Sequence, residues 1–304
     1  MKDRKISFEV VVGSHNYLLN HAKSDMDKKA FFYPSFTDLY NGDKKSPVSK
    51  SKTLDVEFHD LRKLPNMLYK ANVNFLEVLF SVRVFQGDDL YQALYAKRED
   101  IARMNLPYLF EACFTGMFER KVGEFLRDTA YINVNESDKE REEKVNKHLM
   151  VATRILDFLN RYAKNGFTSF ESAIRYYDHI EEDRQMKKFL FDVREGKIKK
   201  TPFSFDLPEF LLKKKAEVEA LKPFYKAQPV NEQLRSELEE LIKQHVMLNV
   251  HKEITELENQ KHDWEPVDSQ GYEMQCCTCG QFIALMEQDV WKREINAVCK
   301  SKMK

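Results

Sequence analysis

The sequence predicts an α+β protein: a small mixed β-sheet with flanking helices, then an all-helical region, then a small Cys-rich tail. β-Branched and aromatic residues indicate strands at 5–12 and 26–33, and alternating apolar and acidic residues indicate a third at 53–58. From Asp60 onward, apolar residues recur at the spacing of amphipathic helices. Only nine glycines and nine prolines occur among 304 residues, which favours a helix-rich chain.

Capping and breaking residues divide the helical region. Asp60 is expected to cap the first helix, and Thr168-Ser-Phe-Glu171 has the pattern of a capping box. Residues 41–52 are rich in Gly, Lys, Ser and Pro, so we expect a mobile basic loop between the second and third strands. Further helices are expected at 88–104, 107–130, 139–165, 207–225 and 231–258.

The charge balance and the hydropathy pattern exclude several classes of protein. The 49 basic and 49 acidic residues cancel, so a polyanion would have to meet a local basic patch. No apolar run approaches the roughly 20 residues of a membrane span, and the N-terminal residues lack the apolar segment of a signal peptide. Five cysteines, three of them at 276–279, do not resemble a secreted disulfide framework. We therefore expect a cytoplasmic protein with no membrane partner.

A pair of aspartates near the N-terminus carries the strongest chemical signal. Asp25 and Asp27 stand two residues apart in a predicted strand, so their side chains would project from the same face. Carboxylates this close repel each other unless one is protonated or a cation lies between them. Mg²⁺, a hard cation that prefers oxygen ligands, satisfies this requirement. The alternative is that both aspartates lie in a solvated turn.

A third carboxylate is expected on the strand at 53–58, which places Asp55 and Glu57 on one face. If this strand lies beside the second strand, Asp55 would join Asp25 and Asp27. Three carboxylates could hold a pair of Mg²⁺ ions, with Asp55 nearest the attacking hydroxyl and able to accept its proton. Glu57 is the rival for the third position, and Asp55 is preferred because Glu57 is nearer the end of the strand.

The turn Gly13-Ser14 ends the first strand and offers backbone N–H groups and a hydroxyl to phosphate oxygens. Lys28 and Lys29 follow the aspartate pair directly, and Lys29 is expected to help neutralise a phosphate. A metal pair beside such a phosphate site is suited to phosphoryl or nucleotidyl transfer. The alternative is that Gly13-Ser14 forms a plain hairpin.

Four segments of the sequence resemble those of a known family. These segments are Val11-Val-Gly-Ser-His-Asn-Tyr17, Ser24-Asp-Met-Asp27, Asp55-Val-Glu-Phe-His-Asp-Leu-Arg-Lys63 and Lys70-Ala-Asn-Val-Asn-Phe-Leu-Glu-Val-Leu-Phe80. They resemble the signature of the DNA polymerase beta-like nucleotidyltransferase superfamily, and above all its RlaP type, which is linked to RNA repair. A weaker likeness at Lys147-His-Leu-Met-Val-Ala-Thr-Arg154 and Arg194-Glu-Gly-Lys197 extends the coverage to residues 5–200.

The resemblance implies that Gly13 and Ser14 contact a triphosphate and that Asp25, Asp27 and Asp55 bind the metals. We therefore expect Mg²⁺-dependent transfer of a nucleoside monophosphate from a nucleoside triphosphate to an acceptor hydroxyl, with release of pyrophosphate. That the acceptor is an RNA end follows from the resemblance alone, with DNA or protein less favoured. The alternatives are a catalytically silent module that binds nucleotides or nucleic acid, and an enzyme that modifies a protein.

Two positions depart from the family pattern. Leu18 follows the Tyr where the family usually has Gly, and Val73 follows the Asn where it usually has Pro. Leu18 lies between the phosphate turn and the aspartates, so it could alter how the substrate fits. Neither departure removes a metal ligand. The expected organisation is a nucleotidyltransferase core at 1–85, a helical region packing on it at 86–258, and a tail at 259–304.

The tail contains one Cys276-x-x-Cys279 pair, which is typical of half a zinc ribbon. His262 and Cys299 could complete a four-ligand Zn²⁺ site, with Cys277 as a competing ligand. Four protein ligands would leave no open position, so the metal would be structural. The alternative is a reduced, metal-free cysteine cluster.

Overall fold

The computed structural model describes most of the chain. The described residues are 4–21, 24–50, 54–134, 139–198, 207–259, 261, 264–267, 269, 273–279, 281–284, 297 and 299. Contacts divide the chain into two compact units. The first consists of Met1–Tyr33 and Lys44–Lys243, and the second of Pro34–Asp43 and Gln244–Lys304.

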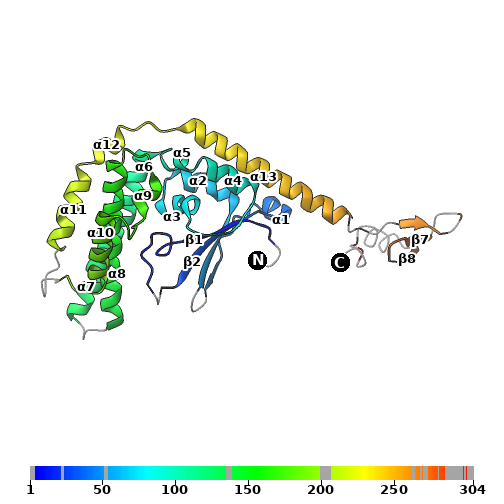
Figure 1. Ribbon diagram of the computed structural model, residues 1–304. Helices are drawn as coiled ribbons and strands as arrows, with labels where there is room; N and C mark the ends of the chain where they lie inside the picture. The colour runs from blue at the N-terminus through cyan, green and yellow to red at the C-terminus, as the bar shows by residue number, and fades with distance from the viewer. Residues whose placement is uncertain are drawn as a thin grey trace. The chain divides into compact units, whose positions relative to one another are not determined.

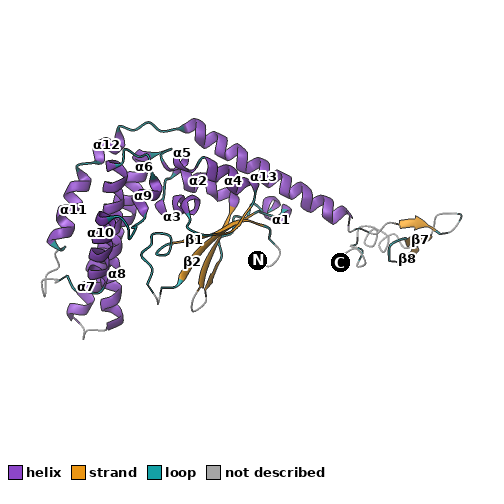
Figure 2. Ribbon diagram, in the orientation of Figure 1, coloured by secondary structure: helices purple, strands orange, loops and turns teal. Residues whose placement is uncertain are grey.

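A five-stranded mixed sheet forms the N-terminal part of the first unit (Figure 2). Its strand order is β3-β4-β2-β1-β5, in which β2 and β4 are parallel and the other neighbours are antiparallel. The three strands expected from the sequence are present as β1, β2 and β4. The bounds are β1 Ile6–Val12, β2 Met26–Phe32, β3 Val48–Lys50, β4 Leu54–Asp60 and β5 Val84–Gly87.

Strands β3 and β5 were not expected. The predicted loop at 41–52 contains β3, a three-residue edge strand too short to show an alternating pattern. All four residues of β5 are exposed, so no buried face marks it in the sequence. Both are recognised only through their partners, β4 for β3 and β1 for β5.

One face of the sheet changes from apolar to acidic along the strands. Residues that are partners in neighbouring strands share a face, which places Phe8 with Phe31 and Val12 with Asp27. The Phe8 and Phe31 rings stack with their centroids 4.5 Å apart in the core. Asp27 is in turn the partner of Asp55 across the parallel pair β2–β4. Asp27 and Asp55 therefore lie toward the end of this face away from the stacked rings.

Short helices follow the sheet strands and cover this face. Asp60 caps the first of them as predicted, because its carboxylate accepts a hydrogen bond from the Arg62 backbone N–H at 2.9 Å. Val73 occupies the first position of α3, where proline is also favoured, so the departure from the family pattern leaves the helix start intact. The elements are η1 Leu61–Lys63, α2 Leu64–Tyr69, α3 Val73–Leu76, η2 Glu77–Phe80, α4 Asp89–Ala96, α5 Arg98–Ala102 and α6 Leu106–Glu111.

Longer helices build the second half of the first unit, where α8 packs against α7, α10 and α11 (Figure 1). The helix expected at 107–130 is three segments, because the π-helix η3 Ala112–Glu119 separates α6 from α7. Pro223 starts a separate helix within the expected 207–225. The elements are α7 Arg120–Val134, α8 Lys139–Lys164, α9 Phe170–Ile174, α10 Glu181–Arg194, α11 Glu209–Glu219, α12 Lys222–Lys226 and α13 Glu232–Asn259.

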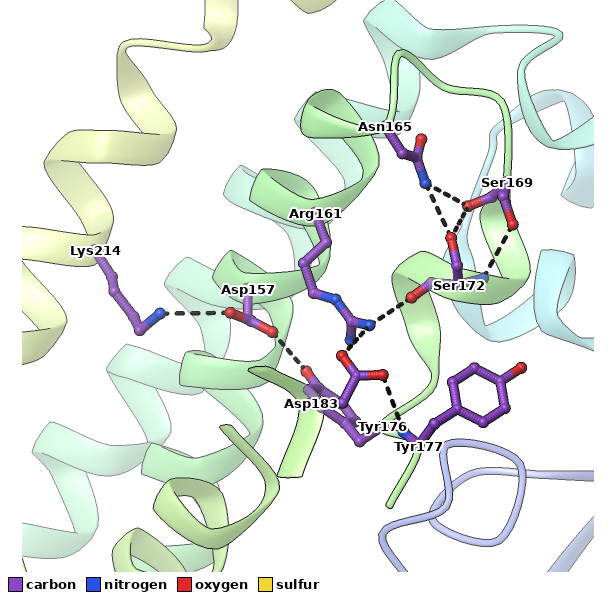
Figure 3. A network of polar contacts seen from close by, with 9 residues as sticks. All are labelled: Asp157, Arg161, Asn165, Ser169, Ser172, Tyr176, Tyr177, Asp183 and Lys214. Atoms are coloured by element: carbon purple, nitrogen blue, oxygen red, sulfur yellow. Dashed lines mark hydrogen bonds and ion pairs between the residues drawn. The ribbon is translucent and has the colours of Figure 1, made fainter. Parts of the chain in front are cut away.

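A polar network fixes the connection between α8, α9 and α10 (Figure 3). Arg161 donates to the Ser172 carbonyl at 2.5 Å and to Asp183 at 2.7 Å, and Asp183 accepts from the Tyr177 N–H at 3.0 Å. Ser169, and not the predicted Thr168, caps α9 by accepting from the Ser172 N–H, without the reciprocal bond of a capping box. These bonds hold the segment after α9 in a defined position beside α8.

The second unit contains α1 Phe36–Tyr40, the last part of α13 and the cysteine-containing tail. Ser35 and Asp38 form a capping box at α1, and the Phe36 N–H donates to Glu253 at 3.0 Å. In the tail, a three-stranded sheet has the order β6-β7-β8, with β6 Trp264–Pro266, β7 Glu273–Cys276 and β8 Phe282–Ala284.

The five-stranded sheet followed by helices confirms the predicted α+β fold class. Among the helices described, none is long and apolar enough to cross a membrane.

Candidate active site

The turn after β1 lies directly against one of the predicted aspartates. Gly13 has a φ of 70°, a left-handed conformation that favours glycine. A Cβ atom at this position would stand 2.8 Å from Asp27 Oδ2, closer than real Cβ contacts allow. Glycine is therefore required both by the backbone conformation and by the approach of the carboxylate. The turn therefore differs from a simple hairpin, because the Asp27 carboxylate packs directly against its glycine.

Asp25, Asp27 and Asp55 line one cavity of about 490 Å³ together with Gly13 and Ser14. Asp27 lies in β2 beside Asp55 of β4, and Asp25 directly precedes β2. Burial raises the pKa of Asp27, and the Asp55 carboxylate raises it further. A divalent cation between these side chains would relieve both effects.

Glu57 faces the same cavity but is paired with Lys29 and His59 of the protein itself. Its carboxylate lies 2.8 Å from Lys29 Nζ and 3.4 Å from His59 Nε2. Hydrogen bonds from His59 and Lys29 lower the pKa of Glu57 to about 2, against the opposing effect of burial. Lys29, predicted to contact a phosphate, lines the cavity and is paired with this carboxylate. The pairing favours Asp55 over Glu57 as the third metal ligand.

Glu77 accepts hydrogen bonds from the Gly13 turn. It was not predicted as a site residue. Its carboxylate accepts hydrogen bonds from the Gly13 N–H at 3.0 Å, the Asn16 amide at 3.1 Å and the Tyr17 hydroxyl at 2.8 Å. The side chain is buried, and burial raises the pKa of its carboxyl group. The sequence could have indicated this role, because Glu77 lies inside the apolar run Phe75–Phe80 and a buried carboxylate needs hydrogen-bond partners.

Cations from the helical region complete the cavity. Lys147 and Arg154 on α8 and Arg194 at the end of α10 line it. Arg154 is buried, and its guanidinium carbon lies 4.0 Å from the centre of the Tyr17 ring. In the sequence, these residues were recognised only as parts of segments that resemble the family, with no role at the site. Their role was missed because no local pattern connects residues more than 100 positions apart.

The helical region also holds the turn through its backbone. The Tyr176 N–H donates to the Tyr17 carbonyl at 3.2 Å, and the buried Arg175 donates to the Asn16 carbonyl at 3.3 Å. Arg175 also donates to the Phe80 carbonyl. Tyr176 belongs to the network of Figure 3, so the Gly13 turn is tied to the helical region at several points.

Leu18 adopts a φ of 61°, the left-handed conformation that favours glycine. This is the position where the sequence departs from the Gly of the family pattern. The chain therefore keeps the backbone conformation for which the family's glycine is suited.

The residues at the cavity fit a hard divalent cation. The donors available are carboxylate oxygens of Asp25, Asp27 and Asp55, the ligand type that Mg²⁺ prefers. The cavity is lined by five acidic and five basic side chains, so it matches an anionic substrate that carries its own metal ions. Figure 1 shows the strands β1 and β2 that carry the Gly13 turn and Asp27.

A second group of candidate ligands lies in the tail. The sulfur atoms of Cys276, Cys279 and Cys299 all lie within 4.8 Å of one another. Cys276 ends β7, and its N–H donates to the Gln281 carbonyl at 2.8 Å in the turn that leads to β8. Cys277 is exposed and lies outside this group. His262, the predicted fourth ligand, lies outside the described residues.

These features define a nucleotidyltransferase: a mixed sheet with paired carboxylates, beside a glycine turn and a set of cations. Residues 1–268 match the model of the family described as RlaP, RNA repair pathway DNA polymerase beta family, and the chain belongs to this family. The resemblance seen in the sequence is thereby confirmed. The family match ends before the cysteine group.

Two other comparisons add little detail. A crystal structure of a nucleotidyltransferase-like protein from Exiguobacterium sibiricum 255-15 is similar to this chain at 11% identity. The match covers 86% of this chain and 77% of that chain, with a TM-score of 0.26. No curated protein matches the sequence significantly. The assignment therefore rests on the family match.

Proposed function

We propose that the protein transfers a nucleoside monophosphate from a nucleoside triphosphate to the hydroxyl at an RNA end, with Mg²⁺ as cofactor and pyrophosphate as product. The observation that supports this most strongly is the pairing of Asp27 with Asp55 across β2 and β4, beside Asp25 and the Gly13 turn. The RNA acceptor is proposed from the family description.

Asp25, Asp27 and Asp55 would hold the metal. When bound, Mg²⁺ lowers the pKa of the attacking hydroxyl and offsets the negative charge of the triphosphate. The Ser14 hydroxyl and the backbone N–H groups of the turn bind phosphate oxygens. Lys147 and Arg194 neutralise the remaining charge of the triphosphate from the helical side of the cavity.

The reaction forms one bond and breaks one. The acceptor oxygen attacks the α-phosphorus, and the bond from this phosphorus to the pyrophosphate oxygen breaks. The hydroxyl proton passes to Asp55 and then to solvent, and the pyrophosphate leaves with the electron pair of the broken bond. Glu77 acts as a positioning residue, because it fixes the Gly13 N–H, Asn16 and Tyr17.

The test is an Asp25→Asn, Asp27→Asn double variant, assayed with each α-labelled nucleoside triphosphate, Mg²⁺ and pooled RNA. We expect transfer to RNA by the wild type and a loss of at least about 10³-fold in the variant, because the ligands of the metal are removed. Asp178→Asn is the control, since Asp178 is exposed and pairs with Lys187 away from the cavity.

Two results would contradict the proposal. Absence of transfer with every nucleotide and acceptor would favour the silent binding module, and label incorporated into protein would favour a protein acceptor. Circular dichroism of each variant must match that of the wild type, so that a loss of activity is not caused by unfolding.

The proposal also includes the division of the chain into a core at 1–85, a helical region at 86–258 and a tail at 259–304.

We further propose that the tail binds a structural Zn²⁺ ion through Cys276, Cys279 and Cys299, with His262 as the fourth ligand. Tetrahedral Zn–S bonds of about 2.3 Å place sulfur atoms roughly 3.8 Å apart. Cys276 Sγ and Cys299 Sγ lie 3.9 Å apart and both residues are buried, so this pair already has the required spacing.

Metal analysis of the purified protein tests the zinc site. We expect about one equivalent of zinc in the wild type and in Cys277→Ser, and a loss of metal in Cys279→Ser. The comparison is matched, because both cysteines lie in the same turn and only Cys279 belongs to the group. Less than about half an equivalent in the wild type would reject the four-ligand site.

A further inference from the structure

A second cavity of about 460 Å³ adjoins the candidate active site within the first unit. Its volume lies within the roughly 300–1,000 Å³ of ordinary ligand pockets. Asn74, at the start of α3, lines both cavities. The two cavities therefore share a lining residue, so ligands bound in them would lie close to each other.

The π-helix η3 forms one wall of this cavity and leaves it open at Gly116. A Cβ atom on Gly116 would meet only the Glu111 carbonyl oxygen, at 3.8 Å, which is an ordinary contact. The fold therefore does not require glycine there, and the absence of a side chain keeps the space free. π-Helical segments are frequent at functional sites, which agrees with this position.

The lining combines an apolar base with an exposed aromatic ring and amides. Met117 is buried at the cavity, whereas the Tyr108 side chain is 43% exposed. Asn72 accepts from the Asn74 N–H at 3.0 Å through its carbonyl oxygen, so its NH₂ group is directed elsewhere. An exposed ring next to amide groups suits the stacking and hydrogen bonding of a nucleobase.

The charge around the cavity favours an anion. Lys70 and Arg120 line it, and within the described part of the chain Lys70 forms no ion pair. The one lining carboxylate, Glu111, is paired with Lys226 at 2.9 Å and with Lys222 at 3.2 Å. A hydrogen bond from Lys226 lowers the pKa of Glu111, so its negative charge is already compensated. The surplus of positive charge suits a phosphodiester.

We propose that this cavity binds the terminal nucleotide of the acceptor RNA, with its base against Tyr108 and its phosphate at Lys70 and Arg120. The inference rests on the proposed function, since it names where the acceptor of that reaction lies. The nucleoside triphosphate is assigned to the first cavity, which holds the carboxylates and the helical cations. The one carboxylate of the second cavity, Glu111, is already paired with two lysines, and the cavity offers the polymer a path away from the reacting hydroxyl.

The test is the binding of a short fluorescent single-stranded RNA, measured by anisotropy at fixed salt. Gly116→Leu fills the cavity, and Gly123→Leu is the matched control on α7, because a Cβ at Gly123 meets nothing within 4 Å. We expect Gly116→Leu to weaken RNA binding by roughly tenfold or more, which is the scale of one lost stacking contact. Gly123→Leu should bind RNA like the wild type.

A second variant keeps the proposal testable should Gly116→Leu fail to fold. Lys70→Gln with Arg120→Gln changes two exposed side chains, so the fold should be retained. We expect weaker RNA binding and a shallower dependence of affinity on salt concentration, because fewer phosphate contacts are made. An unchanged affinity and salt slope would overturn the proposal.

The outcomes separate this proposal from the reaction itself. If Gly116→Leu binds RNA like Gly123→Leu, the acceptor cavity is wrong even when the wild type transfers nucleotides. If Gly116→Leu loses RNA but the wild type transfers nothing, the cavity is supported and the proposed reaction fails. If Gly116→Leu instead weakens Mg²⁺–nucleoside triphosphate binding and leaves RNA binding unchanged, the cavity belongs to the nucleotide and the proposal is overturned.

Discussion

Gly13 and Asp27 are coupled, because the turn after β1 can approach the carboxylate only where no side chain is present. The sequence motif pointed to Gly13 as a phosphate contact. The geometry adds a second reason for glycine, the 2.8 Å that would separate a Cβ from Asp27 Oδ2. A substitution at Gly13 therefore acts on the Asp27 carboxylate as well as on the backbone.

Gly13→Ala should abolish most of the transfer activity, by about 100-fold or more, because the new methyl group displaces the Asp27 carboxylate. Gly42→Ala is the matched control. Gly42 has a φ of 72°, but a Cβ added there would meet nothing within 4 Å, so the variant carries the same backbone strain and no clash. Each variant should lose about 1 kcal/mol or more of unfolding free energy in urea. Equal activity in both variants would contradict the coupling.

Leu18 provides a second test at this scale. A non-glycine residue at a φ of 61° costs roughly 1–2 kcal/mol, whereas replacing the half-buried leucine by glycine loses apolar contacts. These effects oppose each other, so Leu18→Gly should change the unfolding free energy by less than about 1 kcal/mol. Leu18→Ile should be clearly less stable, because β-branched residues tolerate this conformation poorly. Equal losses for both variants would show that the strain is absent.

Among the elements, the segment between α9 and α10 links the helical region to the Gly13 turn. Arg175 donates to carbonyls of Asn16 and Phe80, and Tyr176 donates to that of Tyr17. The network of Figure 3 holds this segment from the other side, through Asp157, which accepts from the Tyr176 hydroxyl at 3.0 Å. The turn is therefore positioned by residues far from it in the sequence.

Arg175→Met should destabilise the protein by about 2–4 kcal/mol, because two buried carbonyl groups lose their donor. It should also raise the KM for the nucleoside triphosphate, since the Gly13 turn is no longer held. Arg184→Met is the control, because Arg184 pairs with Glu181 on the exposed surface of α10 and should cost no more than about 1 kcal/mol. Urea unfolding and steady-state kinetics measure the two effects. A KM equal to that of the wild type would reject the positioning role.

The strands show what local patterns could and could not predict. The alternation of β4 placed Asp55 and Glu57 on one face, and the apolar run of β1 ended at Gly13 as expected. Strands β3 and β5 were missed because one is three residues long and the other is exposed along its length. The helix at 107–130 was predicted as continuous, whereas the π-helix η3 divides it into three segments.

At the scale of the whole molecule, the sequence predicted one wall of the cavity and missed the other. The carboxylates and the glycine turn lie within a short stretch of chain, so their spacing carried the signal. Lys147, Arg154 and Arg194 reach the cavity only through the packing of α8 and α10, which no local pattern encodes. Glu77 lies within a segment that resembles the family, but its role depends on three donors about 60 residues away.

In the proposed reaction, the α-phosphoryl group is transferred together with its nucleoside. One nucleoside triphosphate, labelled at the α-position in one reaction and at the γ-position in another, tests this directly in the presence of Mg²⁺ and RNA. We predict that the α-label enters RNA while the γ-label appears in pyrophosphate in equal amount, and that Asp27→Asn loses both. Transfer of the γ-label to RNA, or α-label transfer unchanged in Asp27→Asn, would contradict the account.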